Sequence, residues 1–233
     1  VAGDVLTTSY TTASFADKNV GNAKSVSVSG IGLTGTDSGN YTFNTTATAA
    51  ANITQRALTI SASGINKVYD GSLADTVTLG DNRVAGDVLI ASYAAANFAD
   101  KNVGTAKSVS VSGIGLTGTD SGNYSYNTAA STAANITQRA LSISATGTDK
   151  VYDGLVGATV TLNDNRVAGD ALSTGYAAAN FADANIGNAK PISVTGINLT
   201  GGDSGNYTFN TITTASASIL SVAVIPPVVT PPV

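Results

Sequence analysis

The sequence predicts an all-β protein made of tandem modules, and two observations support this class. First, the chain repeats itself every 83 residues: the motif Val-Ala-Gly-Asp begins at Val1, Val84 and Val167, and residues 1–56 are identical to residues 84–139 at 45 of 56 positions. Second, short runs of alternating apolar and polar residues are separated by turns rich in Gly, Asn and Asp, whereas no stretch shows a convincing helical period. We therefore expect each repeat to fold as one β module of an array.

The period also sets the expected domain boundaries. We expect four segments: an incomplete repeat 1 (1–56), repeat 2 (57–139), repeat 3 (140–222) and a proline-rich linker or tail (223–233). Repeat 1 is incomplete because the sequence contains no counterpart, ahead of Val1, of the segment Ala57–Arg83. A start in mid-repeat indicates a fragment of a longer protein. A complete repeat is long enough to bury a modest core of its own.

The strands of one module can be followed in order along repeat 2. Leu58, Ile60 and Ala62 alternate with Thr and Ser, which is the two-residue period of a half-buried strand. The same alternation returns at three later places, namely Val77 with Leu79, Val88 with Ile90, and Val109 with Val111. About seven short strands at this spacing are typical of a β-sandwich or barrel.

The most specific local signal is the turn Asp120-Ser121-Gly122-Asn123-Tyr124. In immunoglobulin-type sandwiches a tyrosine at the start of a strand hydrogen-bonds back across the preceding corner, two residues before a core position. That core position would be Phe43, Tyr126 and Phe209 in the three repeats. The fold class we expect is thus all-β, with tandem Ig-like β-sandwich modules in an elongated array. β-grasp-like modules are the alternative, because they also accommodate this turn.

Composition excludes several classes of function. The chain has no Cys, His, Met or Trp, and all fifteen acidic residues are Asp, so the usual transition-metal ligands and nucleophile–histidine systems are absent. The eleven basic residues are spread over three repeats and form no basic patch, which argues against nucleic acid as a partner. No apolar stretch approaches the length of a membrane span. We expect a protein that is not an enzyme and that needs no cofactor.

Calcium is the one metal that the residue types allow, since it prefers Asp, Asn and backbone oxygens. The candidate ligands recur in repeats 2 and 3 and are Asp81, Asn82, Asp87, Asp164, Asn165 and Asp170. However, the chain has no Asp-x-Asp-x-Asp run and no Glu for bidentate coordination. Each Asp also lies beside Gly or Asn, where an ordinary Asx-turn explains it, and we favour that explanation.

A second repeated motif is Lys-Val-Tyr-Asp-Gly. It supplies two sets of candidate structural residues: Tyr69, Asp70 and Gly71 in repeat 2, and Tyr152, Asp153 and Gly154 in repeat 3. The two tyrosines are expected to be core aromatics, as are Phe98, Phe181, Tyr93 and Tyr176, because each repeat has few large residues with which to fill its interior.

The joints between repeats contain no flexible linker. Gln138-Arg139 runs directly into the first strand of repeat 3, and Gln55-Arg56 does the same before repeat 2. At the end of repeat 3 this Gln-Arg pair is replaced by Ser221-Val222, as terminal repeats of arrays often diverge. One hypothesis is that Arg56 and Arg139 brace neighbouring modules. The alternative is that both are solvated side chains at strand ends.

Three motifs in a fixed order identify a resemblance: Lys-Val-Tyr-Asp-Gly, Phe-Ala-Asp-Lys-Asn-Val-Gly and Leu-Thr-Gly-Thr-Asp-Ser-Gly-Asn-Tyr, followed by Ala-Asn-Ile-Thr. With these motifs the chain resembles the YDG-type repeats of large bacterial surface proteins, which occur in filamentous-haemagglutinin-like adhesins, often exported by two-partner secretion. The resemblance covers everything before the proline-rich tail. Repeat 3 departs from it with Ala184, where repeats 1 and 2 have Lys18 and Lys101.

The resemblance implies an extracellular or cell-surface location and a structural role as the stalk or repeat region of a bacterial adhesin. Such a region would extend a binding domain or contribute to a biofilm matrix, and its partners would be other domains of the same long chain. The alternative function is a set of weak binding modules for host or bacterial surface glycans, matrix polysaccharide or protein, in which repetition supplies avidity.

Overall fold

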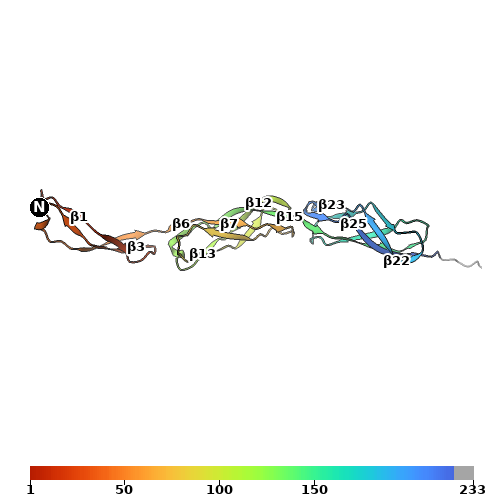
Figure 1. The fold of residues 1–233 in the computed structure, drawn as a ribbon, viewed down its shortest axis with the longest axis horizontal. Helices are drawn as coiled ribbons and strands as arrows, with labels where there is room; N and C mark the ends of the chain where they lie inside the picture. Colours follow the sequence, from red (N-terminus) through yellow and green to blue (C-terminus); the bar gives the residue numbers. More distant parts are fainter. Residues whose placement is uncertain (223–233) are drawn as a thin grey trace, which may run out of the picture. The chain divides into compact units, whose positions relative to one another are not determined.

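The computed structural model describes residues 1–222, and the expected proline-rich tail (223–233) lies outside them. Within residues 1–222 the chain forms β-strands and three short 3-10 turns and contains no α-helix (Figure 1). The predicted all-β class is therefore confirmed. The choice between Ig-like and β-grasp-like modules remains a prediction.

The described chain divides into two compact units whose limits do not coincide with the sequence repeats. Unit 1 combines repeat 1 with the leading part of repeat 2 and comprises residues 1–63, 77–96 and 110–132. Unit 2 combines the rest of repeat 2 with repeat 3. Each unit consequently contains one complete joint between successive repeats. The repeat boundaries as domain boundaries remain a prediction from the sequence.

Repeat 1 is a small antiparallel assembly. Its elements are β1 (Thr7–Ser9), β2 (Thr12–Phe15), β3 (Gly21–Ser29), β4 (Gly32–Thr34), the 3-10 turn η1 (Ser38–Asn40) and β5 (Thr46–Ile53), after which β6 (Arg56–Leu58) leads into repeat 2. Strand β3 lies between β2 and β5 in a three-stranded sheet, and β1 pairs with β4.

Repeat 2 has more and shorter strands than the seven or so expected. They are β7 (Ile60–Gly64), β8 (Lys67–Val68), β9 (Val77–Asp81), β10 (Ile90–Ser92), β11 (Ala95–Phe98), β12 (Gly104–Ser112), β13 (Gly115–Thr117), η2 (Ser121–Asn123), β14 (Tyr124–Tyr126) and β15 (Ala129–Thr137).

Repeat 3 follows the same plan, with β16 leading into it. Its elements are β16 (Arg139–Leu141), β17 (Ile143–Thr148), β18 (Lys150–Val151), β19 (Thr159–Asp164), β20 (Ser173–Gly175), β21 (Ala178–Phe181), β22 (Gly187–Thr195), β23 (Asn198–Thr200), η3 (Ser204–Asn206), β24 (Tyr207–Phe209) and β25 (Ile212–Leu220).

The core of repeat 3 lies between two layers. One layer is the sheet β18-β25-β22-β21, in which β25 and β22 pair over most of their length (Figure 1). The other layer includes the antiparallel pair β17–β19, and β17 packs on β25. Ile192 and Val194, which point into this space from β22, are fully buried. The alternation of apolar and polar residues along β22 places these two side chains on the covered face.

Repeat 1 lacks the second layer because residues 1–56 contain no counterpart of β17 and β19. Val26 and Val28 are the equivalents of Ile192 and Val194, yet both stay partly exposed. No residue of repeat 1 belongs to the buried hydrophobic core of residues 1–222. That repeat 1 is an incomplete repeat remains a prediction from the sequence.

Two expectations about buried side chains are wrong. Val88 and Ile90 were expected to face inward, but they are 55% and 63% exposed, and Leu89 between them is buried. The reason is that the alternation here has the opposite phase: Leu89, Ala91 and Tyr93 face inward, and the residues between them are exposed. The supposed core positions after the tyrosine corner, Phe43, Tyr126 and Phe209, are 47%, 37% and 36% exposed.

The close approach of β17 to the sheet generates a test of this packing. A Cβ atom added to Gly147 would lie 2.6 Å from the Ser216 carbonyl oxygen and 2.8 Å from Ile192 Cδ1. We expect Gly147→Ala to lower the free energy of unfolding of repeat 3 by about 1–3 kcal/mol, because the layers would have to separate. Gly157→Ala is the matched control, since nothing lies within 4 Å of its added Cβ, and it should change stability by less than about 0.5 kcal/mol. Urea denaturation of both variants measures the difference, and equal effects would contradict the proposed close packing.

Candidate functional site

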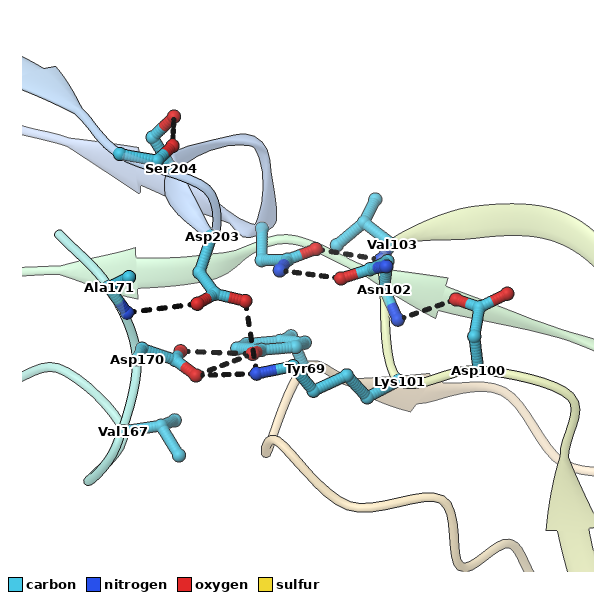
Figure 2. A network of polar contacts seen from close by, with 12 residues as sticks. Tyr69, Asp100, Lys101, Asn102, Val103, Val167, Asp170, Ala171, Asp203 and Ser204 are labelled. Carbon is cyan, nitrogen blue, oxygen red and sulfur yellow. Dashed lines mark hydrogen bonds and ion pairs between the residues drawn. The ribbon is translucent and has the colours of Figure 1, made fainter.

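The joint between repeats 2 and 3, called joint 2 below, is organised around one lysine. Lys101 of repeat 2 places its ammonium nitrogen 2.8 Å from Asp170 Oδ1 and 3.0 Å from Asp203 Oδ1, both of repeat 3 (Figure 2). The Asp170 side chain is only 2% exposed. A carboxylate this buried needs a charged or hydrogen-bonding partner, and Lys101 supplies the charge.

Two tyrosines complete the surroundings of Asp170. The Tyr69 hydroxyl of repeat 2 donates to the Asp170 carboxylate at 2.9 Å, and the Tyr207 hydroxyl of repeat 3 donates to Oδ2 at 2.6 Å. The two rings meet edge to face with centroids 5.5 Å apart. Tyr207 also accepts the Val167 backbone N–H at 2.9 Å. Asp170 is therefore held by donors from both repeats.

Side-chain amides of Asn and Gln also form hydrogen bonds across joint 2. Asn206 of repeat 3 accepts the backbone N–H of Val103 at 2.9 Å and donates its own NH2 group to Asn102 Oδ1 at 3.1 Å (Figure 2). Gln138 of repeat 2 donates to the carbonyl oxygens of Gly205 and Tyr207 at 3.1 and 3.2 Å. These bonds fix the orientation of the two repeats at joint 2 in addition to the ion pairs.

The chain itself crosses joint 2 as a strand. β16 continues from β15 after a single residue and pairs in parallel with β24 of repeat 3, so that Arg139 lies opposite Tyr207 and Leu141 opposite Phe209. Leu141 is buried. A paired strand replaces a linker, as the absence of Gly and Pro at this place in the sequence suggested.

The loop that presents Lys101 is held by a separate ion pair. Lys107 lies 2.6 Å from Asp100 Oδ1, and the same oxygen accepts the Asn102 backbone N–H at 2.9 Å. Lys107 follows Ala106, whose φ of 49° is unusual for a residue with a side chain. The Ala106 N–H is accepted by Asn135 at 2.7 Å, which holds this strained conformation. The loop is thus braced on the side away from the joint.

The residues of the Lys-Val-Tyr-Asp-Gly motif lie partly in a loop and partly at joint 2. Lys67 binds Asp70 at 2.9 Å and the carbonyl oxygens of Ser72 and Ala74, which closes the loop. Gly71 takes a φ of 77°, a conformation that favours glycine. Between these residues, Tyr69 projects to Asp170 of the next repeat. The motif therefore positions a joint tyrosine.

The charges at joint 2 shift the pKa values of its groups. Burial by itself would raise the pKa of Asp170, but the hydrogen bonds from Lys101, Tyr207 and Tyr69 outweigh burial and hold the pKa below its ordinary value. The hydrogen bonds to Asp170 and Asp203 raise the pKa of Lys101. Burial, followed by the hydrogen bond to Asp170, raises the pKa of Tyr207 to about 12. All three groups therefore keep their joint-forming protonation states at neutral pH.

Joint 1, between repeats 1 and 2, repeats this arrangement. Lys18 lies 2.5 Å from Asp87 Oδ1 and 2.7 Å from Asp120 Oδ1, and the Tyr124 hydroxyl donates to Asp87 at 2.5 Å. Asn123 accepts the Val20 N–H at 2.9 Å. The hydrogen bonds from Lys18 and then from Tyr124 lower the pKa of Asp87.

One group distinguishes the two joints. Residues 1–56 contain no equivalent of Tyr69, and Lys18 is 61% exposed where Lys101 is 35% exposed. A cavity of about 210 Å³ lies at joint 1 beside Lys18, Arg56 and Tyr124. At joint 2 the Tyr69 ring packs on Tyr207, which is the counterpart of Tyr124. Joint 2 is thus the more completely packed of the two.

The calcium ligands proposed from the sequence lie apart from one another in the structure. The candidate calcium ligands do not converge: Asp81 and Asp164 bind Arg83 and Arg166, and within residues 1–222 no cluster of acidic side chains could hold a metal ion. The remaining candidates are also engaged elsewhere, with Asn82 and Asn165 accepting backbone N–H groups and Asp87 and Asp170 lying in the joints.

Arg56 and Arg139 lie at the joints, as expected, but their side chains form no ion pair within residues 1–222, and Arg139 Nε is buried without a hydrogen-bond partner. The lysines form the ion pairs instead. The sequence carries a signal for the lysines: Lys18 and Lys101 give way to Ala184 in repeat 3, in parallel with the loss of the Gln-Arg pair.

The tyrosines also differ from expectation. Tyr69 is buried, but its ring packs on Tyr207 of the next repeat as well as lying 5.8 Å from Lys101 Nζ of its own. Tyr152 is 45% exposed, so its assignment to the core is wrong. Tyr124 and Tyr207 do form hydrogen bonds, but their partners lie 37 and 40 residues earlier in the chain and not across the adjacent corner. Phe98 and Phe181 are buried as expected, whereas Tyr93 and Tyr176 are only half-buried.

Comparison with known proteins agrees with the repeat structure. The sequence profile described as YDG domain matches residues 1–49, 54–133 and 137–215. No curated protein sequence matches the chain. Among solved structures, Drosophila N-cadherin EC1-3 matches with 9% identity over 86% of this chain and 77% of that chain, at a TM-score of 0.22, which is too low to support any argument. Within the described residues no helix could span a membrane.

The hydroxyl of Tyr69 provides a test of joint 2. We expect Tyr69→Phe to destabilise this joint by about 1–2 kcal/mol, because the buried Asp170 carboxylate loses a hydrogen bond. The Val103 N–H, which donates across the joint, is the local reporter, and its protection from hydrogen exchange should fall about tenfold. Tyr152→Phe is the matched control, since Tyr152 is exposed and should leave this protection unchanged. Unchanged protection in Tyr69→Phe would contradict the assigned role.

Acid should weaken joint 2. The folded-state pKa of Asp170 is lowered, so its contribution to stability is fully present above the unfolded-state pKa of about 3.9 and is lost as pH falls through the lower folded value. We expect the amide resonances of Val103 and Ala171 to move together as the pH is lowered from about 6 to 2. Asp170→Asn removes the titrating group and should flatten this transition, and a transition of equal size in that variant would exclude Asp170 as its cause.

Proposed function

The chain belongs to the YDG domain family, and from this premise we propose that it is a structural repeat region of a bacterial surface or secreted adhesin. In this role it extends a binding domain away from the cell or contributes bulk to a biofilm matrix. Its location is extracellular or on the bacterial surface, and it catalyses no reaction. Its partners are other domains of the same long chain.

The observation that carries this proposal is the construction of the joints. A stalk transmits position along its length only if neighbouring modules are fixed to each other. Joint 2 uses a buried carboxylate bound by Lys101 and Tyr69 from one side and by Tyr207 from the other, together with a paired strand. Joint 1 uses the same lysine and aspartate geometry. A flexible Gly/Ser linker would instead leave the modules free to reorient.

The chemistry of the chain also fits a spacer. Most of its polar side chains are Thr, Ser and Asn, and charged residues make up 11% of the sequence. The charged residues that are present are largely used in ion pairs within loops and joints, for example Lys67 with Asp70 and Lys101 with Asp170. This leaves a surface with few free charges to attract ligands nonspecifically.

Small-angle X-ray scattering on the complete chain tests the proposal. We expect the wild-type chain to scatter as a stiff rod, and the double variant Tyr69→Ala/Lys101→Ala to show a shorter maximum dimension and the Kratky profile of a hinged particle. Tyr152→Ala is the control, because Tyr152 contacts no following repeat within residues 1–222 and is exposed. A wild-type profile that already matches a flexible string would refute the stalk.

A second candidate function is weak binding through a repeated groove. In repeat 3 a shallow cavity of about 500 Å³ is lined by Leu141, Asn165, Phe209 and Asn210, among others. The equivalent residues of repeat 2 are Leu58, Asn82, Tyr126 and Asn127. An exposed aromatic ring flanked by amides is a surface on which a sugar could stack, and repetition would add avidity.

A glycan array discriminates between the two functions. The binding function predicts that the complete chain retains a common class of glycan and that Tyr126→Ala/Phe209→Ala, which removes both exposed rings, abolishes retention. The double variant should remain folded because neither ring belongs to the core. Silence of the wild-type chain on the array at high density favours the stalk.

A further inference from the structure

Repeat 1 presents the same acidic face that receives a lysine in the other two repeats. The Val5 N–H donates to Asp37 Oδ2 at 2.9 Å, as Val88 does to Asp120 and Ala171 does to Asp203 at the same distance. The backbone of these three aspartates is nearly identical, with φ values of −102°, −101° and −99°. Tyr41 donates to Asp4 as Tyr124 does to Asp87 and Tyr207 to Asp170. The face formed by Asp4, Asp37, Asn40 and Tyr41, called the leading face below, is thus preformed.

The leading face of repeat 1 has no lysine. At joints 1 and 2 the Oδ1 atoms of both aspartates bind the lysine ammonium. In repeat 1 the Oδ1 atoms of Asp4 and Asp37 and the side-chain amide of Asn40 have no partner within residues 1–222. The Val1 ammonium contacts Oδ2 of Asp4, at 3.2 Å, and the Tyr41 hydroxyl, but neither Oδ1 atom. Two neighbouring carboxylates with unused oxygens favour the binding of a cation.

Repeat 3 lacks the groups that would bind such a face of another repeat. Repeat 3 keeps the exposed Tyr152, the counterpart of Tyr69, and the exposed Ile186, the counterpart of Val103. The loop that carries the lysine in repeat 2 is also intact, because Asp183 binds Lys190 and accepts the Asn185 N–H at 2.8 Å. The lysine itself is replaced by Ala184, and the glutamine that corresponds to Gln138 is replaced by Ser221.

We propose that the leading face of repeat 1 is a docking site for the trailing end of another YDG repeat that carries this lysine and glutamine. By the same chemistry, Ala184 and Ser221 prevent repeat 3 of one molecule from occupying the leading face of a second molecule. Repeats 1 and 3 therefore differ: repeat 1 accepts a lysine-bearing repeat at its leading face, and repeat 3 offers no lysine at its trailing end. This inference goes beyond the proposed stalk, since it assigns a partner to a surface.

Restoring the two missing groups tests the docking site in the complete chain. The variant Ala184→Lys/Ser221→Gln supplies the trailing end, and isotope-labelled wild-type chain supplies the leading face. On mixing at millimolar concentration, we expect chemical shift changes confined to the amides of Val5 and Asp37–Tyr41 of the labelled chain. Unlabelled wild-type chain is the control and should leave these amides unmoved. NMR is chosen because a polar interface of this size, without a covalent tether, binds weakly.

A second labelled chain identifies the contact. Asp4→Asn/Asp37→Asn removes both charges and should lose the shift changes while the rest of its spectrum stays that of the folded chain. Ala184→Lys alone is the fallback partner if the double variant folds poorly, and it should give smaller changes at the same amides. The proposal is overturned if folded Ala184→Lys/Ser221→Gln leaves Val5 and Asp37–Tyr41 unmoved, or if Asp4→Asn/Asp37→Asn does not reduce the changes. Neither result depends on the scattering test of the stalk, which concerns contacts within one chain.

Discussion

At each joint a lysine of one repeat lies between two aspartates of the next, and one of these aspartates has little contact with water. At joint 2 the Asp170 carboxylate is 2% exposed and accepts hydrogen bonds from Lys101, Tyr69 and Tyr207. Removing water from a carboxylate is unfavourable unless every lone pair finds a donor, so the two repeats must meet in one arrangement. Burial of Asp170 is thus favourable in only one orientation of the two repeats. The ion pair that holds the Lys101 loop and the position of Tyr69 both maintain that orientation.

The repeats differ in how completely they meet this requirement, and the differences follow from single residues. Joint 1 has the lysine and both aspartates, and a cavity of about 210 Å³ lies beside Lys18. Repeat 3 has an exposed Tyr152 and no lysine at position 184. Repeat 3 thus keeps the tyrosine of the motif without the lysine, so these two groups vary separately. The antiparallel pairing of β2, β3 and β5 and the 3-10 turn after Asp37 have counterparts in repeats 2 and 3, whereas the lysine that joins one repeat to the next is absent from repeat 3.

The local structure could be predicted from the sequence to a large extent. Leu58 with Ile60 and Val109 with Val111 are buried in strands, as their alternation predicted. An error occurred where the inward-facing set was assigned to the wrong phase: Leu89 is buried, and Val88 and Ile90 on either side of it are exposed. The Gln-Arg pairs lie at the joints, but the lysines and not the arginines form the ion pairs there. Lys101 and Asp170 are 69 residues apart, and no local pattern reports such a contact.

The sequence by itself determined the period of the array, its all-β class and the turns, because each of these depends on residues that are close together in the chain. Only the tertiary structure decided what the Lys-Val-Tyr-Asp-Gly tyrosine does. A tyrosine has an apolar ring that can pack in a core and a hydroxyl that can hydrogen-bond across a joint. Its neighbours in the sequence are the same in both cases. Tyr69 is buried and Tyr152 is exposed, although both stand in identical motifs. The difference lies in Asp170, which is 101 residues from Tyr69 in the chain and which packing alone brings to it.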